Sequence, residues 1–275
     1  NDTATTEIYT LSLHDALRSR PWDEIPNAII KKSEKIIKNK REVFIDKLDE
    51  IPSPYLNGVF EDISSNYLIL ETTRGCPFNC PFCLWTSKKK LREFSLKRVL
   101  KEIDWIKNKA AKINRNRLKV IISDADFLLN PKRARKIIEN ITSKNFNNEI
   151  DWSITTNIKF IKKEILEVSN NQHIKFSLGI QSINPNSIKI LKRENISIPQ
   201  KEMEYKLDMI AKYAPKSTII LEIMIGIPGE RPEDFEKTLR WSMERCLAYM
   251  LKTRNKRNEN EMNAYIDYCT LSVFP

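Results

Sequence analysis

The feature that most constrains the fold is a regular alternation of short apolar runs and amphipathic stretches, which begins near Asn66 and continues to the end of the chain. Runs of strand length separated by stretches with helical spacing are typical of βαβ units joined into a parallel sheet. The expected strands cover residues 67–72, 118–123, 150–156, 174–180, 218–225 and 264–273, and helices are expected to begin near residues 95, 131, 162, 185, 200 and 232. Six such steps predict an α/β fold, a partial TIM-like (β/α)6 barrel.

The residues with distinctive chemistry follow the predicted strands. In a parallel α/β barrel, the loops after the carboxyl ends of the strands share one face and carry the active site. Three cysteines follow the first strand, and the next four strands are followed by Asp124 and Asp126, Thr156 and Asn157, Gln181 and Ser182, and Gly226 and Glu230. The sequence therefore predicts one site at this end of the barrel.

The three cysteines form a CxxxCxxC motif made of Cys76, Cys80 and Cys83. Cysteine thiolates hold iron–sulfur clusters, and a cubane normally takes four of them. Three close ligands leave one iron open for another molecule. Pro77 and Pro81 stiffen the loop, which reduces the entropy lost when the thiolates converge.

Structural zinc is the main alternative for this motif. A closed zinc site needs four ligands, and the other cysteines and histidines, Cys246, Cys269, His14 and His173, are distant in the sequence. We therefore favour an iron–sulfur cluster over zinc or a disulfide. Cys246 and Cys269 are expected to be small buried apolar residues rather than ligands.

With the aromatic Phe82 directly before the last cysteine, the motif resembles the signature of the radical S-adenosylmethionine (SAM) superfamily. The resemblance extends over about residues 51–275. It implies a barrel of the radical SAM type, with Cys76, Cys80 and Cys83 as ligands of a [4Fe–4S] cluster whose open iron chelates SAM. It also implies reductive cleavage of SAM to a 5′-deoxyadenosyl radical, with the protein supplying position and exclusion of water.

The resemblance implies further contacts with SAM. Many family members hold the SAM amino group with a Gly-Gly-Glu segment, and Asp124 and Asp126 stand in its place, although either could instead cap the next helix. Gln181 and Ser182 match a position that contacts the ribose and carboxylate of SAM. Arg193 is a candidate partner for that carboxylate or, equally, a solvated surface residue.

The fifth predicted strand adds the last candidates. Ile225 and Gly226 resemble a segment whose backbone lies against the adenine, where glycine permits close approach. Phe82 is counted with these cofactor-binding residues. Glu222 lies among apolar residues and points either into the barrel or into the helix layer, and it is a candidate catalytic carboxylate. The catalytic residue is otherwise unassigned.

The stretch before the barrel suggests a subgroup. Residues 1–20 resemble the translated sequencing-adapter read-through found in metagenome-derived reading frames, with a genuine N-terminal helix as the alternative. Residues 21–62 resemble the linker that joins a cobalamin-binding domain to the barrel in cobalamin-dependent radical SAM proteins. We therefore expect residues 63–275 to be the radical SAM core, cut at both ends from a parent that also binds cobalamin.

Methyl transfer is the expected reaction of that parent, since many such proteins pass a methyl group from methylcobalamin. The expected partners are a small-molecule or biosynthetic-intermediate substrate and an electron donor such as flavodoxin or ferredoxin. One alternative is a methylthiotransferase acting on RNA or protein, but that family carries three further cysteines upstream, and none precedes Cys76. The other is a non-catalytic iron–sulfur binding module.

Composition limits the other partners. The formal net charge is +11, which suits an acidic partner, but the basic residues lie in separate segments and form no stripe. Nucleic acid is therefore not expected. No apolar run reaches the ~18–20 residues that span a bilayer. Clustered cysteines suit metal in a reducing cytosol, so we expect a cytoplasmic protein without a membrane segment.

Overall fold

The computed structural model describes residues 29–32, 35–38, 45–60, 66–83, 85, 90–111, 118–143, 150–171, 173–256 and 262–270. The chain divides into two compact units between Val59 and Phe60. The first unit contains an antiparallel hairpin of β1 (Ile29–Lys32) and β2 (Lys35–Lys38), followed by the short 3-10 helix η2 (Leu48–Glu50). Residues 1–20, interpreted above as a non-native segment, lie outside the described residues.

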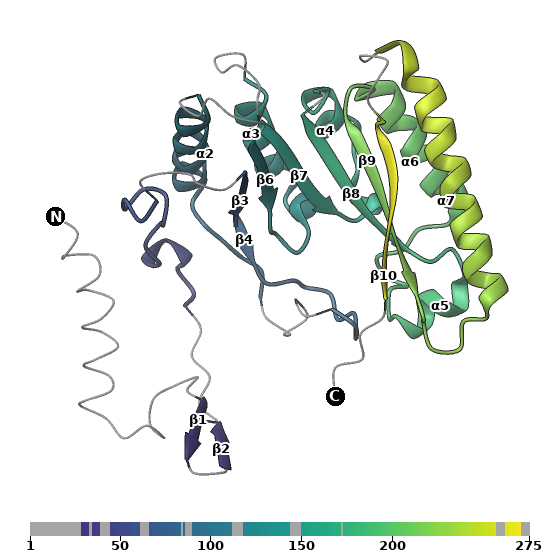
Figure 1. Ribbon diagram of the computed structural model, residues 1–275, viewed down its shortest axis with the longest axis horizontal. Helices are drawn as coiled ribbons and strands as arrows, with labels where there is room; N and C mark the ends of the chain where they lie inside the picture. The colour runs from purple at the N-terminus through teal and green to yellow at the C-terminus, as the bar shows by residue number, and fades with distance from the viewer. Residues whose placement is uncertain are drawn as a thin grey trace. The chain divides into compact units, whose positions relative to one another are not determined.

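The second unit is built on one six-stranded sheet (Figure 1). Its strands are β3 (Tyr67–Leu70), β6 (Leu118–Ile122), β7 (Ile150–Thr156), β8 (Ile174–Gln181), β9 (Thr218–Ile225) and β10 (Ala264–Thr270). All neighbouring pairs are parallel, and the order across the sheet is the order in the sequence, from β3 at one edge to β10 at the other. A sequential, parallel β/α succession whose first and last strands lie at the two edges of the sheet is an open, partial barrel, so the predicted fold class is confirmed.

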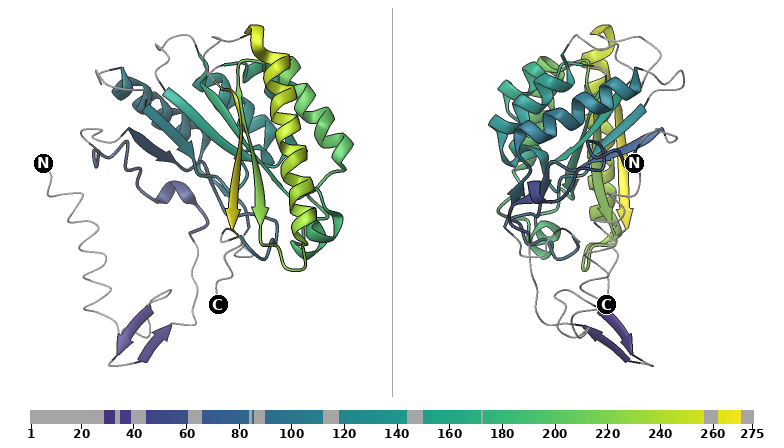
Figure 2. Two further views of the ribbon diagram at one scale, coloured as in Figure 1. Left: turned by 45° about the vertical axis from the view of Figure 1, so that its right-hand side comes forward. Right: turned by 90° about the vertical axis from the view of Figure 1, so that its left-hand side faces the viewer.

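Five helices form one layer on this sheet, as Figures 1 and 2 show. They are α2 (Leu96–Ala110), α3 (Pro131–Ile141), α4 (Lys163–Val168), α6 (Gln200–Tyr213) and α7 (Pro232–Thr253). Each packs against the next in that order. The shorter elements are α5 (Pro185–Ile190), the paired strands β4 (Thr73–Arg74) and β5 (Arg92–Glu93), and the 3-10 helices η3 (Phe127–Leu129), η4 (Ile158–Phe160) and η5 (Arg254–Lys256). Among the described residues, no helix is long and apolar enough to cross a membrane.

The helices begin where local chemistry predicts. The side chain of Ser95 accepts a hydrogen bond from the Arg98 amide at the start of α2, and Asn130 and Asn184 cap α3 and α5 in the same way. Proline follows each of these two asparagines, at a position where its missing N–H costs nothing. These caps satisfy amide groups that the first helical turn leaves without partners.

The two faces of the sheet differ in chemistry. The fully buried positions on one face pack under the helices and include Val120, Ile154, Phe176, Leu178 and Leu221. The alternate positions point to the interior of the partial barrel and are largely polar: Lys119, Ser153, Lys175, Ser177 and Glu222. The apolar face supplies the core, and the polar face leaves the barrel interior available for chemistry.

Candidate active site

The cysteine loop leaves the sheet through β4, which pairs with β5. Gly75 has a φ of 95°, a left-handed value that glycine adopts without steric cost, and it turns the chain into the loop. Cys76 and Cys80 are buried and Cys83 is half-buried, and all three are thiols rather than halves of disulfides. The loop is compact, since the Cys83 amide donates to the Cys80 carbonyl at 3.1 Å.

The three thiols are close enough to influence one another. Burial raises the pKa of Cys76, and the charges of Cys83, Cys80 and Asp126 raise it further. Burial also raises the pKa of Cys80, although the charge of Arg193 opposes this. Neighbouring thiolates repel one another, which makes it unfavourable to deprotonate all three. A bound metal removes this electrostatic penalty, because its positive charge stabilises the deprotonated ligands.

The donor set fits a cluster better than a single ion. The thiolates of a cubane bind different iron atoms, so they surround a cluster rather than meet at a point. Three neighbouring thiols on a glycine- and proline-shaped loop suit that requirement.

Arg193 reaches this loop from the end of α5. The amides of Lys192 and Arg193 donate to the carbonyls of Lys189 and Ile188, both at 3.0 Å, which is the Schellman pattern of a helix C-terminus. Lys192 takes the left-handed position with a φ of 49°. This turn reverses the chain so that the next residue, Arg193, enters the protein interior.

The Arg193 side chain is buried, with 8% of its surface exposed, so the surface alternative is excluded. Its Nη1 lies 3.8 Å from Cys80 Sγ, and its Nη2 donates to the Gly179 carbonyl at 3.2 Å. Its Nε is buried and makes no hydrogen bond with the described residues. A guanidinium is therefore fixed beside a proposed cluster ligand, with its Nε–H still available as a donor.

Gln181 lies beside this arginine. It has a φ of 68°, unusual for a residue with a side chain, and it follows a register shift between β8 and β9. A Cβ added to Gly179 would lie 3.1 Å from Gln181 Nε2, 3.7 Å from Arg193 Nη2 and 3.9 Å from Glu222 Oε2. The Gln181 Oε1 is buried without a hydrogen-bond partner among the described residues. Polar groups thus converge above Gly179 with hydrogen-bonding capacity to spare, as in a site that awaits a polar ligand.

Asp124 braces the start of the cysteine loop. Its Oδ1 accepts from the Thr72 and Thr73 amides at 2.7 and 2.9 Å, and its Oδ2 accepts from Thr72 Oγ1 at 2.5 Å. Burial raises the pKa of this carboxyl, and these hydrogen bonds oppose the rise. Asp124 therefore ties the end of β6 to the end of β3.

Asp126 has a second bracing role. Its Oδ1 accepts from Thr156 Oγ1 at 2.6 Å and from the Leu128 amide at 3.2 Å, and its Oδ2 accepts from the Asn157 amide at 3.0 Å. It thus caps η3, whereas α3 is capped by Asn130. The charge of Asp126 raises the pKa of Cys76, and the charge of Arg193 lowers the pKa of Asp126. Of the two aspartates, Asp126 is therefore the one whose charge acts on the cysteine loop.

Replacing Asp126 with asparagine is expected to change the pH dependence of stability. Burial raises the pKa of Asp126 to about 6, despite the hydrogen bonds it accepts. The folded state therefore holds this proton more tightly than the unfolded state, so Asp126 costs stability as pH rises from about 4 to 6, by roughly 3 kcal/mol. In urea unfolding of the cluster-free chain, Asp126→Asn should lose less stability than the wild type over this range.

Asp151 supplies the control for this experiment. Burial raises its pKa, but hydrogen bonds from His173 and Lys175 outweigh burial and the pKa is lowered. Asp151 therefore contributes stability above its ordinary pKa, and this stability is lost as pH falls through the lowered pKa. Asp151→Asn should change the pH dependence of stability in the sense opposite to Asp126→Asn. Identical profiles for the two variants would contradict the assignment.

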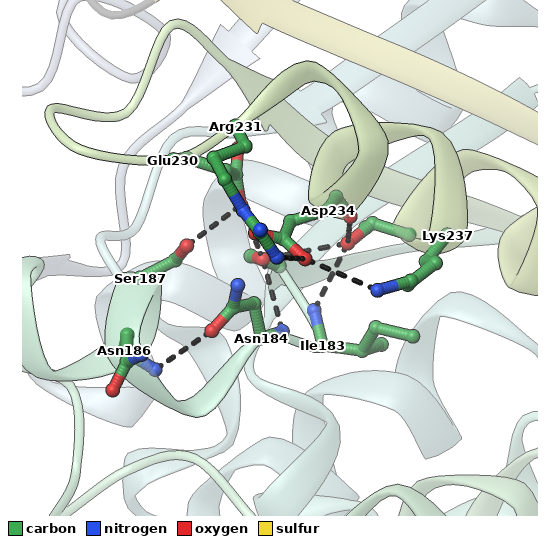
Figure 3. A network of polar contacts seen from close by, with 10 residues as sticks. Ile183, Asn184, Asn186, Ser187, Glu230, Arg231, Asp234 and Lys237 are labelled. Atoms are coloured by element: carbon green, nitrogen blue, oxygen red, sulfur yellow. Dashed lines mark hydrogen bonds and ion pairs between the residues drawn. The ribbon is translucent and has the colours of Figure 1, made fainter.

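The Ser182 hydroxyl is turned into the protein. Ser182 Oγ and Ser187 Oγ both donate to Glu230 Oε1, at 2.8 and 2.7 Å, and the Asn184 amide donates to Ser182 Oγ at 3.1 Å. Figure 3 shows this network, in which the loops after β8 and β9 meet. The side chain is fully buried, so within the structure Ser182 joins two loops of the rim. Sequence reasoning placed Glu230 at this rim without recognising that it links the loops.

The aromatic residue of the motif packs across the site. Phe82 contacts a small buried cluster of Leu191, Met224 and Ile227, from the ends of α5 and β9. Gly226 has a φ of 84°, and a Cβ there would meet no atom within 4 Å. The backbone of Gly226 therefore borders open space, and the side chain of the preceding residue, Ile225, is exposed.

The structure also settles three ambiguities of the sequence. Glu222 points into the barrel interior, where its Oε1 accepts from Ser177 Oγ at 2.5 Å. His173 lies at the opposite end of the strands and its Nδ1 is 3.0 Å from Asp151 Oδ1. Cys246 is buried on α7, as expected of an apolar residue, and burial raises its pKa to about 11. His14 and the side chain of Cys269 lie outside the described residues.

Comparison with known proteins gives consistent matches. The cobalamin-dependent radical SAM methyltransferase TokK of Streptomyces tokunonensis is 23% identical over 78% of the chain and 32% of its own length. The tRNA-2-methylthio-N(6)-dimethylallyladenosine synthase of Thermosipho africanus is 26% identical over 85% of the chain and 53% of its own length. The chain thus spans about a third to a half of these relatives.

A similar fold occurs in the radical SAM methyltransferase TsrM of Kitasatospora setae, solved with cobalamin and a [4Fe–4S] cluster bound. The TM-score is 0.62 at 15% identity, over 87% of the chain and 48% of that protein. The sequence model of the radical SAM superfamily matches residues 70–242, which is more than half of the chain. The chain therefore belongs to the radical SAM superfamily.

Proposed function

We propose that this chain is the core of an enzyme that binds a [4Fe–4S] cluster through Cys76, Cys80 and Cys83 and cleaves SAM. The observation that carries the proposal is the buried polar cradle of Arg193 and Gln181 directly beside Cys80. Both side chains keep a buried polar atom without a partner among the described residues. Buried polar atoms in that state are costly unless a ligand completes them.

Held by Cys76, Cys80 and Cys83, the cluster would supply the electron for reductive cleavage of SAM to methionine and a 5′-deoxyadenosyl radical. The chain's own residues bind and orient the cofactor. Arg193 offers positive charge to the SAM carboxylate, and the Gln181 amide offers a further hydrogen bond. Gly226 lets the adenine approach the backbone, and Phe82 with its apolar cluster excludes water from that side of the site. Asp126 is the aspartate we assign to the SAM amino group, since its charge acts on the cysteine loop.

For the complete protein we propose cobalamin-dependent methyl transfer to a small-molecule or biosynthetic-intermediate substrate, in the cytoplasm, with an electron donor such as flavodoxin or ferredoxin. The similarity to TokK and the fold shared with TsrM support this proposal. Residues 21–62 would then be the linker from a cobalamin-binding domain, and residues 63–275 the radical SAM core. Glu222 is a candidate substrate contact, because it faces the barrel interior.

Methylthiotransfer is the second candidate. The 26% identity to a tRNA methylthiotransferase favours it. Methyl transfer is preferred because the similarity to TokK and the fold shared with TsrM both lead to cobalamin-dependent methyltransferases.

The test is anaerobic reconstitution with iron and sulfide, reduction with dithionite, and measurement of 5′-deoxyadenosine formed from SAM. The cluster-loaded chain should release this product, and Cys80→Ala should release none. A folded, cluster-loaded chain that binds SAM without ever cleaving it would identify a binding module and refute the enzyme assignment.

The cradle itself is tested by Gly179→Ala. The added methyl would lie 3.1 Å from Gln181 Nε2, so the amide must shift by a few tenths of an ångström from its position in the cradle. We expect SAM affinity, measured by calorimetry on the cluster-loaded chain, to fall about tenfold, which is ~1.4 kcal/mol. In the Gln181→Ala background the same substitution should have little further effect, since the clashing group is gone. If Gly179→Ala lowered the SAM affinity equally in both backgrounds, the proposed contact between the added methyl and the Gln181 amide would be contradicted.

A further inference from the structure

The guanidinium of Arg193 is held in place independently of any SAM molecule. One nitrogen contacts the sulfur of Cys80 and another donates to the Gly179 carbonyl. The Schellman turn at Lys192 fixes the backbone that carries the side chain. A buried arginine with two anchored nitrogens cannot swing into solvent, so its charge stays beside the sulfur.

We propose that Arg193 sets the reduction potential of the cluster through its hydrogen bond to the Cys80 sulfur. The inference rests on the proposed function, because it requires Cys80 to be a cluster ligand. Hydrogen bonds to the sulfurs and nearby charge are among the determinants of iron–sulfur potentials. Arg193 is a positioning residue in this role, since it acts on the cluster through the ligand.

The direction of the effect follows from electrostatics. Reduction adds one negative charge to the cluster, so a fixed neighbouring cation stabilises the reduced form more than the oxidised form. Burial strengthens the interaction, because solvent and salt screen it less. Asp126 partly offsets this cation, since it interacts electrostatically with Arg193 and raises the pKa of Cys76. The arginine therefore makes the cluster easier to reduce.

A neighbouring residue provides a matched control. Lys192 directly precedes Arg193 and carries the same charge, but its side chain is exposed. Its charge is screened by solvent and contributes little at the cluster. Removing one charge at each position therefore separates the buried contact from the overall charge of the chain.

The experiment is a redox titration of the cluster-loaded chain, without SAM, followed by the electron paramagnetic resonance of the reduced cluster. For Arg193→Gln, we expect the ratio of reduced to oxidised cluster at the wild-type midpoint to fall about tenfold, which is a shift of about 59 mV to lower potential for one electron. Arg193→Lys keeps the charge but not the planar, forked guanidinium, so its midpoint potential should lie between those of the wild type and Arg193→Gln. Lys192→Gln should titrate like the wild type.

The outcomes distinguish this inference from the proposed function. An unchanged potential in Arg193→Gln, with wild-type iron and sulfide content, would overturn the inference and leave the cluster assignment intact. Full cluster retention by Cys80→Ala would instead overturn the ligand assignment. If Arg193→Gln loads no cluster, the midpoint potential is measured instead on Arg193→Met, which also removes the charge. Arg193→Lys, which keeps the charge, is compared with it. Equal potentials for every loaded variant and the wild type would likewise refute the role.

Discussion

Replacing Cys80 with alanine is expected to abolish the brown absorbance of the reconstituted cluster near about 400 nm. Cys80 is the most buried of the three thiols and the one in contact with Arg193. A cubane with only two cysteine ligands loses the three-point attachment that holds it in the loop. Iron and sulfide analysis should show the same loss as the absorbance.

Cys246→Ala is the control for that result. Cys246 is as deeply buried as Cys80, but it lies on α7, where its sulfur donates to the Tyr265 carbonyl at 3.5 Å. Its removal takes a thiol from the core without touching the cysteine loop, so the cluster should load fully. A Cys80→Ala protein that retained the full content of iron and sulfide would refute the ligand assignment.

Replacing Asp124 with alanine is expected to destabilise the chain by about 3–5 kcal/mol. The carboxylate accepts hydrogen bonds from two backbone amides and one hydroxyl, all contributed by Thr72 and Thr73. Alanine would leave those buried donors without an acceptor and would release the start of the cysteine loop from β6. Urea denaturation of the cluster-free protein measures the loss.

Asp208→Ala is the corresponding surface control. Asp208 is exposed and pairs with Lys252 on a neighbouring helix at 2.5 Å. Exposed ion pairs typically contribute less than about 1 kcal/mol, so this variant should unfold nearly like the wild type. Equal losses in the free energy of unfolding would contradict the prediction that the buried Asp124 carboxylate stabilises the fold more than the exposed Asp208 carboxylate does.

Local sequence determined the elements of this protein. The observed β7 and β9 match the predicted residues and α6 begins at the predicted position, because apolar periodicity and proline act within a few residues of each other. The order of the strands followed from the βαβ pattern, and the loops with polar residues therefore fall at one end of the sheet. The cysteine spacing was likewise local, and it indicated the cluster before any tertiary contact was known.

Tertiary structure alone decided how the side chains at that end are used. Arg193 is 113 positions from Cys80 along the chain, and only packing of the α5 turn against the loop brings them together. The hydroxyls of Thr72 and Ser182 bind carboxylates from other loops. Glu222 could face either layer until the sheet and its helices defined an inside and an outside. Periodicity records which residues share an element, whereas the charge and hydrogen bonding of a buried site depend on contacts between elements that no local pattern encodes.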